Sequence, residues 1–244
     1  MPDYRDEWTW KLATGKTFAE VGGLWRTLSE KVTVAALAGA TSVAMIDNID
    51  PLGQGVWWPA FDKRCAELGV SGVKKYAVSI DNPQVRDIVG AYDVVHCSGV
   101  LYHCPNPILT VGNLLSITNE WLLLSLVVMP PVITNSAGTI RMSSDSAYLV
   151  PTLSATNHAI FSEHCRVTYG SAMGLDAPAK TWFFADGTPD YAPWWWLWTS
   201  SYVKKMLECF PIEVVFEGPL SGSAAHFFAC RKTGRELPKN MSPF

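Results

Sequence analysis

The chain has 244 residues, of which 48% are hydrophobic and 17% charged, so it can bury a large core and is not a disordered protein. Its net charge is −3 and its pI about 5.9, and the absence of a basic stripe in the sequence argues against a nucleic-acid partner. The length fits one α/β domain, residues 1–244, with room for an insertion.

Short apolar runs alternate with helix-like stretches along the first half of the chain, which predicts a parallel sheet with helices on both faces. Five strands are predicted there, at residues 17–21, 42–47, 73–80, 92–98 and 120–129. The intervening helices are predicted at residues 29–38, 59–69, 83–90 and 106–118. The strands are nearly continuous runs of Val, Leu and Ile, which is typical of strands buried on both sides.

The periodicity breaks in the second half. From about Pro130 to Pro193 the chain is rich in Ser, Thr, Gly, Pro and aromatic residues, without a helical or strand period. A connection of this length is usually functional or forms a small subdomain, so residues 130–193 are predicted to be a substrate-cap insertion. A helix over residues 199–210, with Thr199 or Ser200 as its cap, and an antiparallel hairpin of two strands follow.

A glycine pair, Gly22 and Gly23, follows the first strand, where a ligand can approach the backbone closely. A dinucleotide loop needs two more spaced glycines to seat a pyrophosphate, and this chain has Leu24 and Arg26 there. Their bulk matters less for a ligand without phosphates, such as S-adenosylmethionine, whose ammonium and carboxylate groups Glu20 and Arg26 could bind. The alternative interpretation is an ordinary tight turn between a strand and a helix.

Polar residues also stand at the predicted carboxyl ends of the other strands, where open α/β sheets bind ligands. Asp47 ends the second strand, and a carboxylate at that place is suited to accept hydrogen bonds from both hydroxyls of a ribose. Asp81 and Ser98 follow the third and fourth strands. This convergence is a stronger indication of a ligand site than the glycine pair alone.

The stretch "YDVVHCSGVLYHCPNPILTV", from Tyr92 to Val111, combines a strand led by Asp, the run Ser-Gly-Val-Leu-Tyr-His, and a Pro-x-Pro helix start. It resembles class I S-adenosylmethionine-dependent methyltransferases, and most of all the branch that includes the tRNA wobble-uridine carboxymethyltransferases, which carry a similar "GVLYH". The resemblance covers about residues 17–129 and, more weakly, residues 194–215.

The resemblance implies an α/β fold with a Rossmann-like sheet of seven strands, the last one antiparallel, helices on both faces, and a cap insertion between strands five and six. It places the family's first motif on Glu20 and Gly22, with Leu24 and Arg26 in place of the later glycines. We therefore interpret the glycine loop as a modified cofactor loop that still binds its ligand. The predicted cofactor-binding residues are Glu20, Gly22, Gly23, Arg26, Asp47, Ile80, Asp81, Ser98 and Gly99.

Methyl transfer to a protonated oxygen or nitrogen needs a general base. His103 is the candidate, because the loop after the fourth strand faces the transferred methyl group and histidine titrates near neutral pH. Tyr102 would orient the substrate or form part of the methyl pocket. The alternative is that both residues are structural, with His103 bonded to the backbone.

Other histidines and a tryptophan run have weaker assignments. His96 lies within a strand and is predicted to be a satisfied core histidine. His158 and His164 are six residues apart, which does not fit a helical metal site, so no metal is predicted and His158 is assigned to substrate binding. Trp194 and Trp195 open the run "WWWLW". They form either an aromatic wall for the substrate or a buried anchor for the insertion.

The predicted function is therefore methyl transfer from S-adenosylmethionine to an oxygen or nitrogen atom of a small-molecule acceptor, in the cytoplasm. The chain opens without a secretory signal, its six cysteines form no CxxC pair, and its longest apolar stretch is too short to span a membrane. The alternatives are a tRNA-modifying enzyme, suggested by "GVLYH", and a degenerate methyltransferase fold that serves as a non-enzymatic scaffold. A nicotinamide-dependent oxidoreductase is disfavoured because the loop lacks its glycines.

Overall fold

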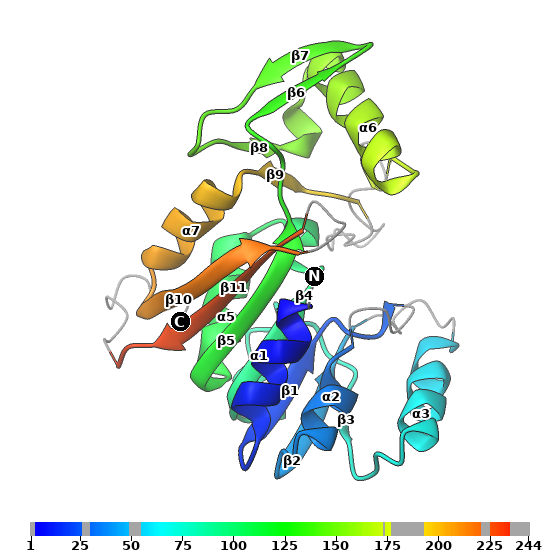
Figure 1. Cartoon of the computed structure of the whole chain (residues 1–244), viewed down its shortest axis with the longest axis vertical. Coiled ribbons are helices and arrows are strands. Elements are labelled where there is room, and N and C mark those ends of the chain that lie inside the picture. Colours follow the sequence, from blue (N-terminus) through cyan, green and yellow to red (C-terminus); the bar gives the residue numbers. More distant parts are fainter. Residues whose placement is uncertain are drawn as a thin grey trace.

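A seven-stranded sheet with the order β10-β11-β5-β4-β1-β2-β3 forms the centre of the protein (Figure 1). The computed structural model describes residues 3–25, 30–48, 55–172, 174–176, 193–220 and 225–234. The strands of this sheet are β1 (Thr17–Val21), β2 (Ser42–Ile46), β3 (Lys74–Tyr76), β4 (Tyr92–Ser98), β5 (Thr118–Val127), β10 (Ile212–Pro219) and β11 (Ala225–Lys232). The first five run parallel, and β11 is antiparallel to both of its neighbours. The predicted sheet with its reversed last strand is confirmed.

Helices cover both faces of the sheet, as predicted. One face carries α1 (Tyr4–Ala13), α2 (Val32–Leu37) and α3 (Trp57–Glu67), and the other carries α4 (Val85–Val89), α5 (Pro107–Ser116) and α7 (Ser200–Glu208). Each face has its own apolar core, because successive side chains of a buried strand point to opposite sides. None of the helices in the described ranges has both the length and the apolar content to cross a bilayer.

Side-chain caps explain where several helices begin. The Asn106 side chain accepts a hydrogen bond from the Leu109 amide at 3.2 Å, and Pro107 occupies the first turn of α5. Thr199 caps α7 in the same way, as predicted, by accepting a hydrogen bond from the Tyr202 amide at 3.2 Å. The helix predicted to start at residue 29 begins instead at Val32, and residue 29 itself lies outside the described residues.

Helix α1 has no counterpart among the predicted elements. Its sequence is rich in charge, and the Asp3 side chain caps it by accepting a hydrogen bond from the Arg5 amide. Trp8 attaches the helix to the sheet, with its ring 5.8 Å from that of Trp121 and 6.5 Å from that of Phe227. Tertiary packing of a few aromatic rings thus stabilises a helix that has no continuous apolar stripe.

The insertion lies between β5 and the last two strands, as predicted, and its described residues form regular elements although the sequence has no helical or strand period. It contains the hairpin β6 (Val132–Asn135) and β7 (Gly138–Arg141), strand β8 (Ala147–Leu149) and helix α6 (Ala155–Tyr169). Strand β8 pairs with β9 (Trp196–Trp198), and the short 3-10 helix η3 (Val150–Thr152) precedes α6. Figure 1 shows these elements standing beyond the carboxyl end of β5.

Candidate active site

The order of the strands reverses at β1, which lies between β2 and β4 in the sheet. In open α/β sheets, this switch point at the carboxyl ends of the strands is where ligands bind. Gly22 directly follows β1, Asp47 directly follows β2, and Ser98 is the last residue of β4. The structure therefore brings these three predicted residues to one edge of the sheet.

The glycine pair is required by the packing of the protein itself. Gly22 has a φ of +80°, and a Cβ atom there would lie 2.1 Å from Cγ2 of Val100 in the loop after β4. A Cβ atom on Gly23 would lie 2.8 Å from both the Glu20 Cδ and the Met45 Cε atoms. Side chains are therefore excluded at both positions even without a ligand. The tight-turn interpretation accounts for the glycines, and a ligand role rests on the groups around them.

Asp47 lies beneath this turn and is 8% exposed. Its Oδ2 accepts a hydrogen bond from the Leu24 amide at 3.0 Å, and its own amide donates to the Tyr76 carbonyl at 3.0 Å. The Leu24 side chain is completely buried in the core beside α2 and α3. The carboxylate thus holds the start of the loop against the end of β2. The predicted cofactor residue Arg26 lies outside the described residues.

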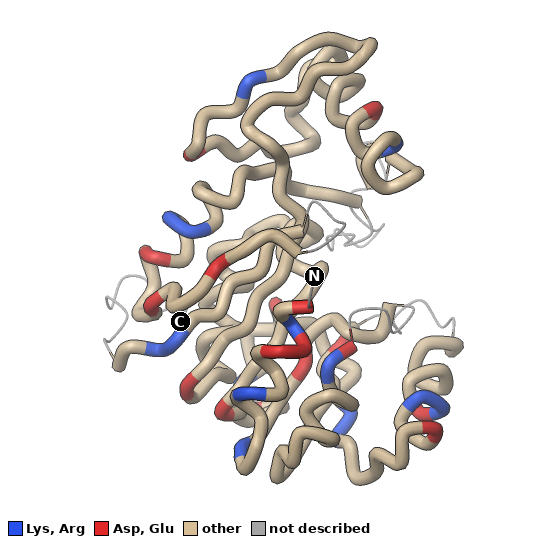
Figure 2. Tube along the Cα trace, viewed as in Figure 1, with Lys and Arg blue, Asp and Glu red and all other residues tan. Residues whose placement is uncertain are grey.

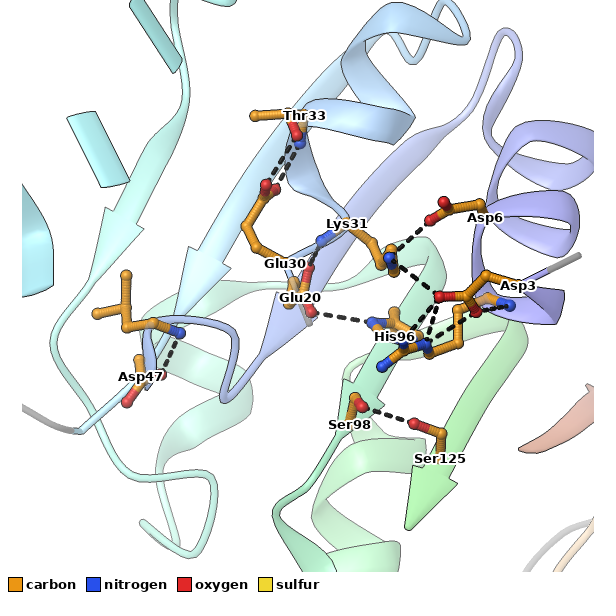
Figure 3. Close-up of polar contacts among 12 residues, drawn as sticks. Asp3, Asp6, Glu20, Glu30, Lys31, Thr33, Asp47, His96, Ser98 and Ser125 are labelled. Atoms are coloured by element: carbon orange, nitrogen blue, oxygen red, sulfur yellow. Dashed lines mark hydrogen bonds and ion pairs between the residues drawn. The ribbon is translucent and has the colours of Figure 1, made fainter. Parts of the chain in front are cut away.

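Glu20 is completely buried, and both of its carboxylate oxygens have partners within the protein (Figure 3). Oε1 lies 3.0 Å from Nδ1 of His96 on β4, and Oε2 accepts a hydrogen bond from the backbone amide of Lys31. Burial raises the pKa of Glu20 above its usual range, and the neighbouring imidazole opposes that shift. Glu20 was predicted to bind the cofactor, but its carboxylate oxygens are bonded to His96 and to the Lys31 amide within the protein.

This charged cluster continues onto helix α1. The Lys31 ammonium group lies 2.6 Å from Asp6 Oδ1 and 3.8 Å from Asp3 Oδ2, although the Lys31 side chain is only 7% exposed. Asp3 in turn accepts hydrogen bonds from the Arg5 guanidinium group. The start of α2 is therefore bound both to β1 and to the helix that covers the sheet, as Figure 3 shows.

Two predicted cofactor-binding residues, Ile80 and Asp81, lie in the loop after β3, because that strand ends at Tyr76 and is shorter than the strand predicted over residues 73–80. Asp81 Oδ1 accepts a hydrogen bond from the Thr110 hydroxyl at 2.7 Å, and the Ile80 carbonyl accepts one from the Asn113 side chain at 2.9 Å. Both partners belong to α5. The loop after β3 is thereby fixed by a neighbouring helix, and the Asp81 carboxylate has a defined position near the switch point.

The end of β4 is linked to β5 by the hydroxyl groups of Ser98 and Ser125, which lie 2.5 Å apart. Gly99, which has a φ of +76°, follows and donates a backbone hydrogen bond to the Ser125 carbonyl at 2.9 Å. The positive φ turns the chain into the short 3-10 helix η2 (Leu101–His103). This turn places Tyr102 and His103 beyond the carboxyl edge of the sheet.

The hydrogen bond of His103 fixes its tautomer. Nδ1 lies 3.0 Å from the carbonyl oxygen of Pro193, at the end of the insertion. A carbonyl oxygen only accepts, so Nδ1 carries the proton and donates it, and in the neutral ring the lone pair resides on Nε2. That tautomer is the one in which Nε2 can accept a proton. The predicted backbone bond and the predicted base role are therefore compatible in this geometry.

Tyr102 is buried and lies in an aromatic cluster. Its ring centroid is 4.6 Å from that of Trp194 and 4.4 Å from that of His103. Burial raises the pKa of the Tyr102 hydroxyl well above its usual value, so this group stays protonated near neutral pH and can donate a hydrogen bond. The Tyr102 carbonyl accepts a hydrogen bond from the Trp195 amide at 2.8 Å.

The tryptophan run fastens the insertion to the sheet. Trp194 and Trp195 are 1% and 6% exposed. The indole of Trp196 donates to the Pro105 carbonyl at 3.2 Å, and that of Trp198 donates to the Val127 carbonyl at 3.1 Å. These bonds connect β9 to the loop after β4 and to the end of β5. The arrangement favours the buried-anchor interpretation, and substrate contact by Trp194 and Trp195 stays a prediction.

His158 lies on α6, and its hydrogen bonds stay within the insertion. Nε2 is 2.6 Å from the Leu175 carbonyl, and Nδ1 is 3.4 Å from the Ser162 hydroxyl. These two partners belong to the insertion and not to the Tyr102–His103 cluster, so the role of His158 toward a substrate also stays a prediction. Across the described ranges, no three His, Cys, Asp or Glu side chains gather in a way that would hold a metal ion.

Sequence reasoning missed two parts of this site. His96 is a core residue, as predicted, but it is not fully satisfied, because its buried Nε2 has no hydrogen-bond partner among the described residues. Its partnership with Glu20 follows from the pairing of β1 with β4, in which Glu20 and His96 are register partners. The other part is the Lys31 amide. The only signal in the sequence was a histidine inside a strand whose residues are otherwise mostly buried.

No protein-family profile and no curated protein sequence matches this chain. Solved structures do match it. Magnesium protoporphyrin IX methyltransferase from Synechocystis PCC 6803, with bound S-adenosylhomocysteine, is 14% identical, with a TM-score of 0.54 over 94% of this chain and 81% of that one. The 1,6-didemethyltoxoflavin N1-methyltransferase of Burkholderia thailandensis is 11% identical, with a TM-score of 0.53 over 95% and 79%.

A third similar structure, from Rhodobacter sphaeroides, is provisionally named a zinc-dependent alcohol dehydrogenase. It is 10% identical, with a TM-score of 0.57 over 95% of this chain and 90% of that one. Neighbours with different names at such low identity establish the fold and not the activity. The chain has the class I methyltransferase fold, with the seven-stranded order and the reversed last strand described above.

Proposed function

We propose that this protein is an S-adenosylmethionine-dependent methyltransferase that acts on an oxygen or nitrogen atom of a small-molecule acceptor. The observation that carries the proposal is the position of Asp47. Its carboxylate lies at the end of β2, beneath the glycine turn and beside the switch point of a class I methyltransferase fold. A carboxylate in that place is suited to bind the two hydroxyls of a ribose.

The residues of the site fit the two ends of the cofactor unequally. Asp47 and Asp81 supply fixed carboxylates for the ribose and the adenine, with Ile80 beside them. At the methionine end, Ser98 and Gly99 lie where the cofactor would pass, whereas the Glu20 oxygens are bonded within the protein. We assign the cofactor carboxylate to Arg26, and Arg26→Ala is expected to weaken cofactor binding several-fold.

When bound, the cofactor supplies a methyl group on a positively charged sulfur. The chain's part is to position the acceptor, exclude water and remove a proton. His103 would accept the acceptor's proton at Nε2, while the Pro193 carbonyl holds the Nδ1 proton and fixes the ring. Tyr102, protonated and packed against Trp194, would bound the methyl pocket. The insertion, residues 130–193, would act as the substrate cap and cover the acceptor.

The two methyltransferase neighbours support a small acceptor, because their names refer to a porphyrin and to a toxoflavin precursor. The distribution of charge supports it as well. Figure 2 shows Lys and Arg interspersed with Asp and Glu along the described chain, without a continuous basic track for a phosphate backbone. We therefore favour a small molecule over tRNA as the acceptor.

One observation favours a second candidate, a scaffold that has lost its cofactor. Glu20 is fully engaged with His96 and Lys31, and Leu24 is buried where related loops have a glycine. Both features also fit a loop that is packed for stability alone. Binding of the cofactor product separates the two candidates.

The test is calorimetric titration of the purified protein with S-adenosylhomocysteine. Micromolar binding is expected, and Asp47→Ala should weaken it about 10- to 100-fold, because hydrogen bonds to a charged group are lost. The matched control is Asp93→Asn, since Asp93 accepts hydrogen bonds from Thr17 at the opposite edge of the sheet. Its affinity should equal that of the wild type. Absence of binding by the wild type would leave the scaffold as the better candidate.

A further inference from the structure

Two buried carboxylates hold the two ends of the loop between β1 and α2. Asp47 Oδ2 accepts a hydrogen bond from the Leu24 amide at 3.0 Å, and Glu20 Oε2 accepts one from the Lys31 amide. These two amides lie on either side of residues 26–29, which are outside the described residues. The bonds act on the backbone, so they do not depend on the glycines that the sequence lacks. The carboxylates therefore determine where the loop starts and where it ends.

Glu20 can hold its end of the loop only if its own position is fixed, and His96 fixes it. When Glu20 is ionised its carboxylate only accepts hydrogen bonds, so the His96 Nδ1 atom, 3.0 Å from Glu20 Oε1, then carries the proton and donates it. Both side chains are 0% exposed. The register of β1 with β4 places them directly opposite each other. The pair therefore connects β4, β1 and the first turn of α2 through one carboxylate.

Burying a glutamate–histidine pair in a core costs more free energy than burying two apolar side chains. Burying an ionised or hydrogen-bonding group costs free energy unless its partners are well placed, and apolar residues of similar volume often replace such pairs without loss of stability. Within the part of the chain that the structure describes, the buried His96 Nε2 atom has no hydrogen-bond partner, which adds to that cost. The feature that an apolar pair could not supply is an acceptor for the Lys31 amide.

We propose that His96 is a positioning residue, which orients Glu20 so that its carboxylate holds the Lys31 amide and sets the loop for cofactor binding. This inference rests on the proposed function, because the loop is taken to be the cofactor loop. It assigns to Glu20 a role within the protein in place of direct contact with the methionine ammonium group. The chain thus compensates for the missing loop glycines with two carboxylates and one histidine.

The test compares His96→Leu with His96→Asn. Asparagine can place its amide nitrogen where Nδ1 lies and still donate to Glu20, whereas leucine cannot donate. His96→Leu should weaken S-adenosylhomocysteine binding about tenfold or more, and His96→Asn should restore it to within about threefold of the wild type. The matched control is His226→Leu, which removes a partly buried histidine that lies 3.3 Å from a glutamate, Glu217, on the β10–β11 hairpin. Its affinity should not change.

A second readout needs no ligand. Site-resolved amide hydrogen exchange should be faster at Lys31 in His96→Leu than in the wild type and in His96→Asn, while the Leu24 amide, held by Asp47, keeps its protection. Equal affinity and equal Lys31 exchange in wild type and His96→Leu would overturn the inference. If the leucine variant does not fold, His96→Gln replaces it, because its amide nitrogen matches Nε2 and not Nδ1.

The two proposals fail in different ways. If the wild type does not bind S-adenosylhomocysteine, the proposed function is overturned, and the exchange rates at Lys31 alone decide the positioning role. If the wild type binds and all His96 variants bind equally well, the proposed function stands and the positioning role is overturned.

Discussion

The two sides of the candidate active site are held together by different kinds of interaction. On the cofactor side, charged groups bind backbone amides and one another: Glu20 to Lys31 and His96, and Asp47 to Leu24. On the acceptor side, around η2 and β9, the contacts are made by aromatic rings and backbone carbonyl groups. Trp194 packs on Tyr102, and His103 donates to the Pro193 carbonyl.

The difference suits the chemistry proposed for each side. A cofactor with ribose hydroxyls and a charged amino-acid end needs fixed carboxylates and a loop with a defined path. An acceptor that loses a proton needs one base in a site from which water is excluded, and aromatic packing provides that exclusion. The contrast also predicts which substitutions affect binding, which affect rate and which affect stability alone.

The largest expected effect is a loss of methyl-transfer rate from a substitution on the acceptor side, with cofactor affinity unchanged. His103→Ala should lower the rate of methyl transfer by about 100- to 10,000-fold, because the general base is lost. Its affinity for S-adenosylhomocysteine should stay that of the wild type. The rate is measured as S-adenosylhomocysteine formation with an acceptor found by screening phenols, carboxylic acids and amines. A variant that is as fast as wild type would assign His103 a purely structural role.

The next effect concerns the aromatic packing that holds the insertion. Trp194→Ala should lower the free energy of unfolding by about 3–5 kcal/mol, because a large side chain with 1% exposure leaves a cavity. The control is Trp10→Ala, since Trp10 is 55% exposed on α1 and its loss should change stability by less than about 0.5 kcal/mol. Urea denaturation measures both. Equal effects of the two substitutions would contradict the anchor role.

On the cofactor side, Gly22→Ala tests how much the backbone conformation and close packing of the glycine turn contribute to stability. The positive φ and the contact with Val100 should together cost about 2–4 kcal/mol of stability. Gly69→Ala is the matched control, because Gly69 has a φ of +69° but open space around it. Its cost should be about 1–2 kcal/mol from the conformation alone. If thermal unfolding gives equal losses, the close approach of the two loops does not contribute.

The smallest expected effect is a pH dependence of stability that arises from Asp3, in the charged cluster on the cofactor side. Burial acts to raise the pKa of Asp3, but the hydrogen bonds and charge of Arg5 outweigh it and hold that pKa below its usual value of 3.8. Asp3 thus stabilises the folded state above pH 3.8, and its contribution falls away as the pH drops through the lower folded value. The melting temperatures of wild type and Asp3→Asn should differ at pH 7 and converge in acid. A constant difference would contradict this assignment.

Local sequence signals were sufficient for much of the sheet. Strands β1 and β4 have the predicted bounds, since buried parallel strands are continuous apolar runs. The helix start at Asn106 was legible in the sequence as well, and the cap at Thr199 was predicted, because side-chain caps act within three residues. The positions of Asp47 and Ser98 at strand ends followed from the same strand pattern, whereas β3 ends at Tyr76 and leaves Asp81 in the loop that follows.

Tertiary structure decided the features that depend on distant residues. Helix α1 is stabilised by Trp8 packing on rings of β5 and β11, and no local pattern signals those partners. The pairing of Glu20 with His96 exists because β4, and not β3, lies beside β1, a consequence of strand order. The Nδ1 proton of His103 is likewise fixed by Pro193, ninety residues further along the chain. Sequence alone placed the candidate ligand site at the edge of the sheet, because strand ends are local. Which groups hold that site was decided by contacts between strands, helices and loops that only the folded chain brings together.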